Sequence, residues 1–175
     1  STHLLIDIPV GKGAKVDSMA KAKRLEKKFL AVTKQFNLKT KVLITEGSEP
    51  IGKGIGPMLE ARDVLRVLKN DPKMPELLKQ KGIEMAGIIF EMAGKAKKGQ
   101  GEKMARHILE SGKAYEQMVK IIEAQGKRCI NPEELIEAEF VYDHRAEKDG
   151  KVIRIDNKAI NKIARIAGCP DDKKA

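Results

Sequence analysis

Two glycine-containing loops, each following an apolar run, hold the residues of this sequence with the clearest chemical potential. The first is Gly11-Lys12-Gly13, with Lys15 just beyond it, and the second runs from Gly47 to Gly56. Glycines free backbone N–H and C=O groups for close approach to a ligand, and lysines add positive charge, which suits a phosphate. A tight strand-to-helix turn is the alternative interpretation of the first loop, and the false-positive risk of short glycine motifs favours it.

The second loop matches neither common nucleotide-binding signature. It lacks the Gly-Lys-Ser/Thr ending of a P-loop and the glycine spacing of a dinucleotide fingerprint. The sequence also shows no Ser-His-Asp or Cys-His arrangement, no carboxylate pair placed for glycosidic acid–base catalysis and no cluster of transition-metal ligands. The chain by itself therefore does not look catalytically complete.

Alternating strand and helix patterns are expected to position these loops. Residues 4–8 and 40–45 are typical of strands, the first of them buried on both faces, and a helix from Asp17 or Ser18 to about Phe36 separates them. This order favours parallel pairing with a right-handed crossover. A buried strand at the first residues, without an initiator methionine, indicates that the sequence begins inside a larger domain.

Helices without strand signals are expected between Pro57 and Gly126. One begins at Pro57 and ends before the Asn-Asp-Pro at 70–72, a second covers 77–93, and a third covers 101–125, with a glycine as a weak point inside it. Residues 69–126 are predicted to be packing material rather than an active surface.

The pattern changes after a linker around 126–135. Apolar runs at 140–142 and 151–155 flank Asp149-Gly150, a hairpin turn signal, and a last helix begins at Asp156 or Asn157. We therefore expect an α/β fold. Residues 1–126 would form the later part of a parallel or mixed-sheet α/β domain flanked by helices, and 127–175 a linker and the start of a smaller α+β domain with a β-hairpin.

Composition limits the possible partners. The 175 residues carry a net charge of +10, which favours anionic partners. Only 3% of the residues are aromatic and none is tryptophan, so stacking platforms for single-stranded nucleic acid are poorly supplied and nucleic acid is a weak candidate. No apolar run of residues is long enough to span a bilayer and no signal peptide is visible, which predicts a cytoplasmic protein without membrane partners.

Two segments resemble a known family. Residues 7–15 (DIPVGKGAK) and 48–63 (SEPIGKGIGPMLEARD) look like hallmark segments of the thymidine and pyrimidine nucleoside phosphorylases. Ile8-Pro9 and Gly56-Pro57 look most similar to the archaeal AMP phosphorylase branch, and further matches at 112–114, 121–126 and 156–160 extend the resemblance across nearly the whole chain.

The resemblance implies a phosphorolytic pentosyltransferase. In such an enzyme inorganic phosphate attacks the anomeric carbon of AMP, or of a related nucleotide or nucleoside, and releases the base and a sugar 1-phosphate, which for AMP is ribose 1,5-bisphosphate. The family places its catalytic groups upstream of Asp7, so this chain would be a carboxy-terminal fragment that is inactive alone. Family homo-oligomers form largely through an amino-terminal helical domain. The alternatives are pyrimidine nucleoside specificity and a non-enzymatic, basic nucleic-acid-binding module.

Two family roles carry over to this sequence. Lys15 stands where thymidine phosphorylases have an apolar or aromatic residue beside the base, so it is expected to face the base or a 5′-phosphate, or alternatively solvent. Carbonyls at Ile51 and Gly54 and the carboxylate of Asp63 correspond to ligands of a monovalent cation, expected to be potassium, and no other cofactor is implied. The alternative for Asp63 is an acid in the first turn of a helix, favoured by the helix dipole.

Overall fold

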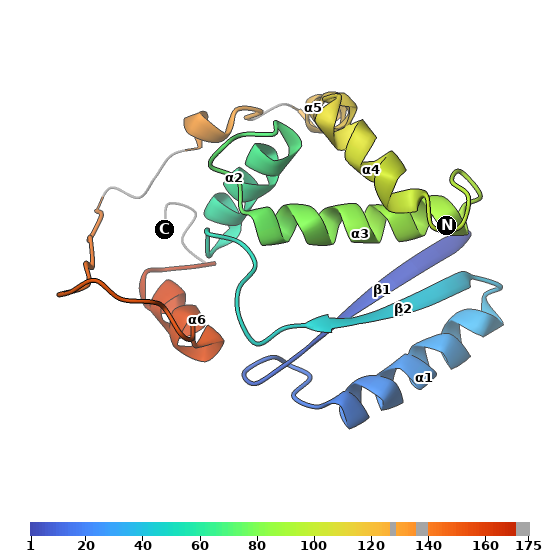
Figure 1. Cartoon of the computed structure of the whole chain (residues 1–175), viewed down its shortest axis with the longest axis horizontal. Helices are drawn as coiled ribbons and strands as arrows, with labels where there is room; N and C mark the ends of the chain where they lie inside the picture. Colours follow the sequence, from blue (N-terminus) through green and yellow to red (C-terminus); the bar gives the residue numbers. More distant parts are fainter. Residues whose placement is uncertain (127–128, 136–139, 171–175) are drawn as a thin grey trace.

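The computed structural model describes residues 1–126, 129–135 and 140–170. Two strands, β1 (His3–Val10) and β2 (Lys39–Glu46), pair in parallel with a register from His3↔Lys39 to Val10↔Glu46. Helix α1 (Met19–Gln35) connects them. The predicted strand–helix–strand unit and its parallel pairing are therefore confirmed. In Figure 1, α1 lies below the strands and α3 (Glu76–Met92) above them.

Local sequence explains where α1 begins and ends. The Ser18 side chain accepts a hydrogen bond from the Lys21 N–H, as an N-cap should. At the other end Asn37 adopts a left-handed φ of 54°, which an asparagine tolerates and which stops the helix. Ala22 is fully buried on the face that packs toward the strands. Strand β1 is less enclosed than predicted, since only Ile8 is buried and the rest is half-buried or exposed.

Helices fill the stretch that lacked strand signals, as predicted. They are α2 (Pro57–Leu68), α3, α4 (Gly101–Glu110) and α5 (Lys113–Ala124). Ile83 from α3 packs with Ala105 and Leu109 from α4 to form the main buried cluster. None of the helices in the described residues is long and apolar enough to cross a bilayer.

The prediction of a single helix over 101–125 is wrong, because the structure divides this stretch into two helices at Gly112. This glycine has φ of +80°, a left-handed conformation that costs other residues more and that ends the hydrogen-bonding pattern of α4. The break lets α5 change direction, and its Tyr115 hydroxyl donates to the Ile130 carbonyl at 2.8 Å. A short 3₁₀ turn, η1 (Pro132–Glu134), follows and is tied to α2 by an Arg66–Glu133 ion pair of 2.9 Å.

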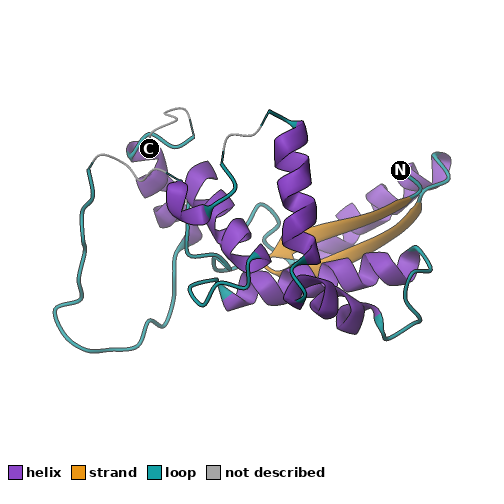
Figure 2. Ribbon diagram, turned by 90° about the horizontal axis from the view of Figure 1, so that it is seen from above, coloured by secondary structure: helices purple, strands orange, loops and turns teal. Residues whose placement is uncertain are grey.

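The predicted β-hairpin is also wrong in the described residues 140–156, which form no strand. Figure 2 shows a long loop here that stands away from the helices. Its apolar side chains are largely exposed, at 86% for Phe140 and 92% for Ile153. An isolated two-stranded hairpin is marginally stable, so a turn signal does not form one without a surface to pack on. The last helix is confirmed as α6 (Asn157–Ile166), and residues 136–139 of the second predicted domain lie outside the described residues.

Candidate functional site

The two glycine loops leave the carboxyl ends of β1 and β2 side by side. Because these strands are parallel, both loops start at the same edge of the sheet. They also touch, since a Cβ added at Gly11 would lie only 2.3 Å from the Ser48 Oγ. Figure 1 shows both loops near α6. The structure therefore brings together the two motifs that the sequence analysis singled out.

Asp63 holds the second loop closed. It projects from the second turn of α2, is 2% exposed, and its Oδ2 accepts hydrogen bonds from the backbone N–H groups of Lys53 at 2.6 Å and Gly54 at 2.7 Å. The first-turn acid of α2 is instead Glu60, which accepts from the Gly56 N–H at 3.0 Å. The interpretation of Asp63 as a first-turn dipole partner is therefore wrong, and its role is to clasp the loop.

The N–H groups of the second loop point to the protein's own carboxylates. Besides the two on Asp63, the Ser48 N–H donates to the Glu46 Oε1 at 2.7 Å. Hydrogen bonds from Ser48 lower the pKa of the exposed Glu46 carboxyl, first through the side chain and then through the backbone N–H. The loop has the shape of an anion-binding turn, but the N–H groups of Ser48, Lys53 and Gly54 already bind internal carboxylates.

One oxygen of Asp63 has no hydrogen-bond partner among the described residues. Oδ1 is buried without one, an arrangement that costs free energy unless a cation or water satisfies it. A Cβ at Gly52 would lie 3.0 Å from the hydrogen-bonded Oδ2 of Asp63 and 3.8 Å from the Gly54 carbonyl oxygen, so this carboxylate and this carbonyl lie near each other. Two of the three predicted cation ligands are thus close together, and the third, Ile51, is half-buried in the same loop.

A polar network that the sequence analysis did not identify lies beside the loops. Asp7 of β1 pairs with Lys81 of α3 at 2.5 Å, and the Thr45 hydroxyl of β2 donates to the other Asp7 oxygen at 2.7 Å. The Lys81 amine also lies 3.0 Å from the Thr45 hydroxyl. Both charged side chains are less than one-fifth exposed. Little in the sequence signals this network, because Lys81 stands in a polar stretch of α3 after Lys79 and Gln80.

Helix α6 contacts the loops from the far end of the chain. The Asn157 side-chain amide donates to the Gly47 carbonyl at 3.1 Å, and the Ile155 N–H donates to the Glu49 Oε1 at 3.1 Å. Asp156 caps the helix, and hydrogen bonds from backbone N–H groups, that of Ala159 first, lower the pKa of its carboxyl. Ile155 and Asn157, at the start of α6, are therefore part of the same wall as the loops.

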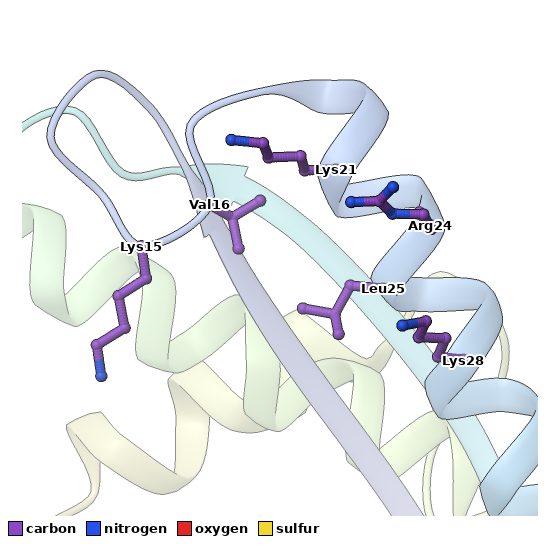
Figure 3. Close-up of a pocket in the computed structure, with 6 residues that line it drawn as sticks. All are labelled: Lys15, Val16, Lys21, Arg24, Leu25 and Lys28. Carbon is purple, nitrogen blue, oxygen red and sulfur yellow. The ribbon is translucent and has the colours of Figure 1, made fainter.

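Lys15 is exposed at the end of the first loop. It lines a pocket of about 190 Å³ together with Val16 and residues of α1. Figure 3 shows its amine directed away from the α1 cations, which leaves it available to a ligand or to solvent. Both sequence interpretations of Lys15 remain predictions.

Comparison with known proteins identifies relatives over the whole chain. The sequence is 48% identical over 176 residues to an AMP phosphorylase of Pyrococcus abyssi and 41% identical over 173 residues to one of Methanococcus aeolicus, matches that cover 100% and 99% of this chain. It is 45% identical over 170 residues to a protein of Albidiferax ferrireducens named "putative thymidine phosphorylase", covering 97% of this chain. No family model matches the chain.

The chain spans only about a third of these relatives, 35%, 34% and 33% of their lengths respectively. The matches nevertheless include both glycine loops, the clasping aspartate and α6, since the aligned region covers the chain almost completely. The resemblance seen in the motifs is confirmed: over its whole length this chain is similar to a segment, about a third, of proteins named AMP phosphorylase and "putative thymidine phosphorylase".

Proposed function

We propose that the chain forms part of a phosphorolytic pentosyltransferase that acts on AMP. An oxygen of inorganic phosphate would bond to C1′ as the bond between C1′ and the base nitrogen breaks, and the products would be adenine and ribose 1,5-bisphosphate. The observation that carries this proposal is the 41–48% identity to AMP phosphorylases across the chain's full length. The closed glycine loops and α6 would form one wall of the substrate cleft.

Such a reaction sets three tasks: holding phosphate, stabilising an oxocarbenium-like transition state, and neutralising the departing base. The loop N–H groups of Lys53 and Gly54 are engaged by Asp63, so they do not supply the phosphate site. We assign to this chain the framework of the cleft and one cation, Lys15, which would face the base or the 5′-phosphate of AMP. The remaining catalytic groups would come from other parts of the enzyme.

A monovalent cation, expected to be potassium, would bind at Asp63 with the carbonyls of Ile51 and Gly54. Oxygen donors from a turn and a carboxylate suit a hard cation, and the partnerless Oδ1 of Asp63 supplies an unsatisfied negative charge there. Bound potassium would neutralise this buried charge and stiffen the second loop. The residues present therefore fit the ion.

The test uses the full-length enzyme with AMP and inorganic phosphate. Chromatography should detect adenine only when phosphate is present, and AMP should be used better than adenosine, thymidine or uridine. Preference for a pyrimidine nucleoside would establish the alternative specificity, for which the relative named "putative thymidine phosphorylase" is the supporting observation. Absence of base release from AMP and from every nucleoside would refute the enzyme proposal. Light scattering on the same sample tests the homo-oligomer expected from the family.

Lys15→Ala tests the role of the loop cation in the same enzyme. Loss of a charge-assisted contact at a partly solvated site should raise KM for AMP by about tenfold and leave nucleoside use nearly unchanged. Lys12→Ala is the matched control, because it removes an equally exposed lysine from the same loop. Equal effects of Lys15→Ala on nucleotide and nucleoside would contradict contact with the 5′-phosphate.

A further inference from the structure

The proposed reaction assigns no role to three α1 cations in the pocket that Lys15 also lines. Lys21, Arg24 and Lys28 line it from α1, and Val16 and Leu25 supply apolar surface between them and β1. The three cations are spaced i, i+3 and i+7, so they follow one side of the helix. Figure 3 shows these three side chains on the α1 side of the pocket, apart from the Lys15 amine.

The charges in this pocket are only partly neutralised. Lys21 pairs with Asp17 at 2.7 Å, and this hydrogen bond is the main cause of the lowered pKa of the Asp17 carboxyl. Neither Arg24 nor Lys28 has a carboxylate partner in the part of the chain that the structure describes. The α1 side of the pocket therefore has an excess of two positive charges beside an apolar surface, where charge attraction is less screened than in open water.

Size and spacing define the anion that fits. The pocket has a volume of about 190 Å³. Its cations extend over seven residues, roughly 10 Å along the helix. A single phosphate reaches only part of this row, whereas a linear chain of two or three phosphates spans it and lets each cation contact an oxygen.

We propose that Lys21, Arg24 and Lys28 form a binding site for a di- or triphosphate group, either inorganic or at the end of a nucleotide. Arg24 supplies a planar fork of donors, and the two lysines act as point charges on either side of it. A nucleic-acid strand is the weaker occupant, because the 3% aromatic content offers few surfaces for base stacking. The proposal does not depend on the phosphorylase reaction.

Titration calorimetry of the 175-residue chain with sodium tripolyphosphate tests the site at low ionic strength. Saturable binding at one site per chain is expected. Arg24→Glu and Lys28→Glu should each weaken tripolyphosphate binding about tenfold, because each removes one charge-assisted contact at an exposed site and adds local repulsion. Asp17→Asn should strengthen binding about twofold to threefold by releasing Lys21.

Lys23→Glu is the matched control. It makes the same charge change on an exposed lysine of α1, about 200° around the helix from Lys21, and should alter the affinity by less than about twofold. Far-UV circular dichroism of each variant checks that α1 is retained. Equal weakening by Lys23→Glu and Lys28→Glu would show a diffuse electrostatic surface and overturn the proposal, and so would the absence of saturable binding.

The choice of ligand separates the two sources of the anion. If ATP competes with tripolyphosphate and adenosine does not, the site recognises the phosphate chain of a nucleotide. If only tripolyphosphate binds, the site takes the inorganic anion, which also supports the proposal. Equal affinity for adenosine and ATP, or tighter binding of a mixed-sequence DNA oligonucleotide than of tripolyphosphate, would overturn it.

Discussion

Asp63→Asn gives the sharpest test of the second loop, because the two oxygens of this carboxylate have different surroundings. Oδ2 accepts two backbone hydrogen bonds, at 2.6 and 2.7 Å, and Oδ1 is buried with no hydrogen-bond partner. An asparagine can keep an oxygen at the first position and place an amide at the second. The substitution therefore removes the charge while keeping the shape of the clasp.

The expected magnitudes follow from this geometry. Asp63→Ala removes both charge-assisted bonds and leaves two N–H groups unpaired in a 2% exposed site, which should lower the free energy of unfolding by about 4 kcal/mol. Asp63→Asn replaces them with neutral bonds of roughly half the strength, so about 1–2 kcal/mol is expected. A bound cation, at a concentration one hundred times its Kd, would raise the free energy of unfolding of the wild type by about 2.7 kcal/mol and that of Asp63→Asn by little.

Urea unfolding followed by circular dichroism measures these differences in potassium chloride and, at equal ionic strength, in tetramethylammonium chloride. Glu60→Gln is the matched control, because Glu60 lies on the same helix and bonds only the Gly56 N–H. It should leave the potassium response unchanged. Identical wild-type stability in the two salts would refute cation binding at Asp63. A loss of less than about 1 kcal/mol in the free energy of unfolding for Asp63→Ala would refute the role of Asp63 in holding the second loop closed.

Three further outcomes are expected. A double-mutant cycle with Asp7→Asn and Lys81→Met should give a coupling free energy of about 2 kcal/mol, because both side chains are less than one-fifth exposed. Urea unfolding of the wild type, the two single variants and the double variant measures this coupling, and simple additivity of the two losses in stability would disprove it. Gly54→Ala should lower the free energy of unfolding by about 2–3 kcal/mol, because the added Cβ would lie 2.4 Å from the Leu59 carbonyl oxygen. Gly150→Ala is the control: its Cβ would meet no described atom within 4 Å, so thermal unfolding should show almost no change in stability. Because the pKa of Asp156 is lowered, its carboxylate stabilises α6 at pH values above the ordinary aspartate pKa of about 3.9, and this stabilisation is lost as the pH falls through the lowered pKa. Hydrogen exchange should therefore show less protection of the Ala159 amide in acid. Asp156→Asn should remove this pH dependence.

The parts of the fold that sequence predicted are those fixed by short-range patterns. Ser18 and Asn37 mark the ends of α1, and Asp156 marks the start of α6, because capping depends on neighbours within three or four residues. The hairpin at 140–155 was wrong for the opposite reason. Asp149-Gly150 permits a turn, but strands persist only against a surface that buries their apolar side chains, and the described side chains of 140–142 are at least 71% exposed.

The candidate site shows the same division. Its glycine loops were visible because glycine spacing is local, and they were enough to indicate the family. The network of Asp7, Thr45 and Lys81 was not visible, since it joins residues up to 74 positions apart by the packing of α3 on the strands. The direction in which Asp63 points was also undetermined, because one residue along a helix rotates a side chain by about 100°.

The inward direction of Asp63 changes what the second glycine loop can do. A glycine turn at the end of a parallel strand offers N–H groups to an anion, and here the protein supplies that anion itself through Asp63. An external phosphate would have to displace a buried carboxylate and leave a charge unpaired, which is strongly unfavourable. The loop is therefore suited to hold a cation against its carboxylate or to remain as a rigid wall. Under the proposed function, the positive charge that faces a phosphorylated substrate would therefore come from side chains, and Lys15 of the first loop is the one that we propose for this role.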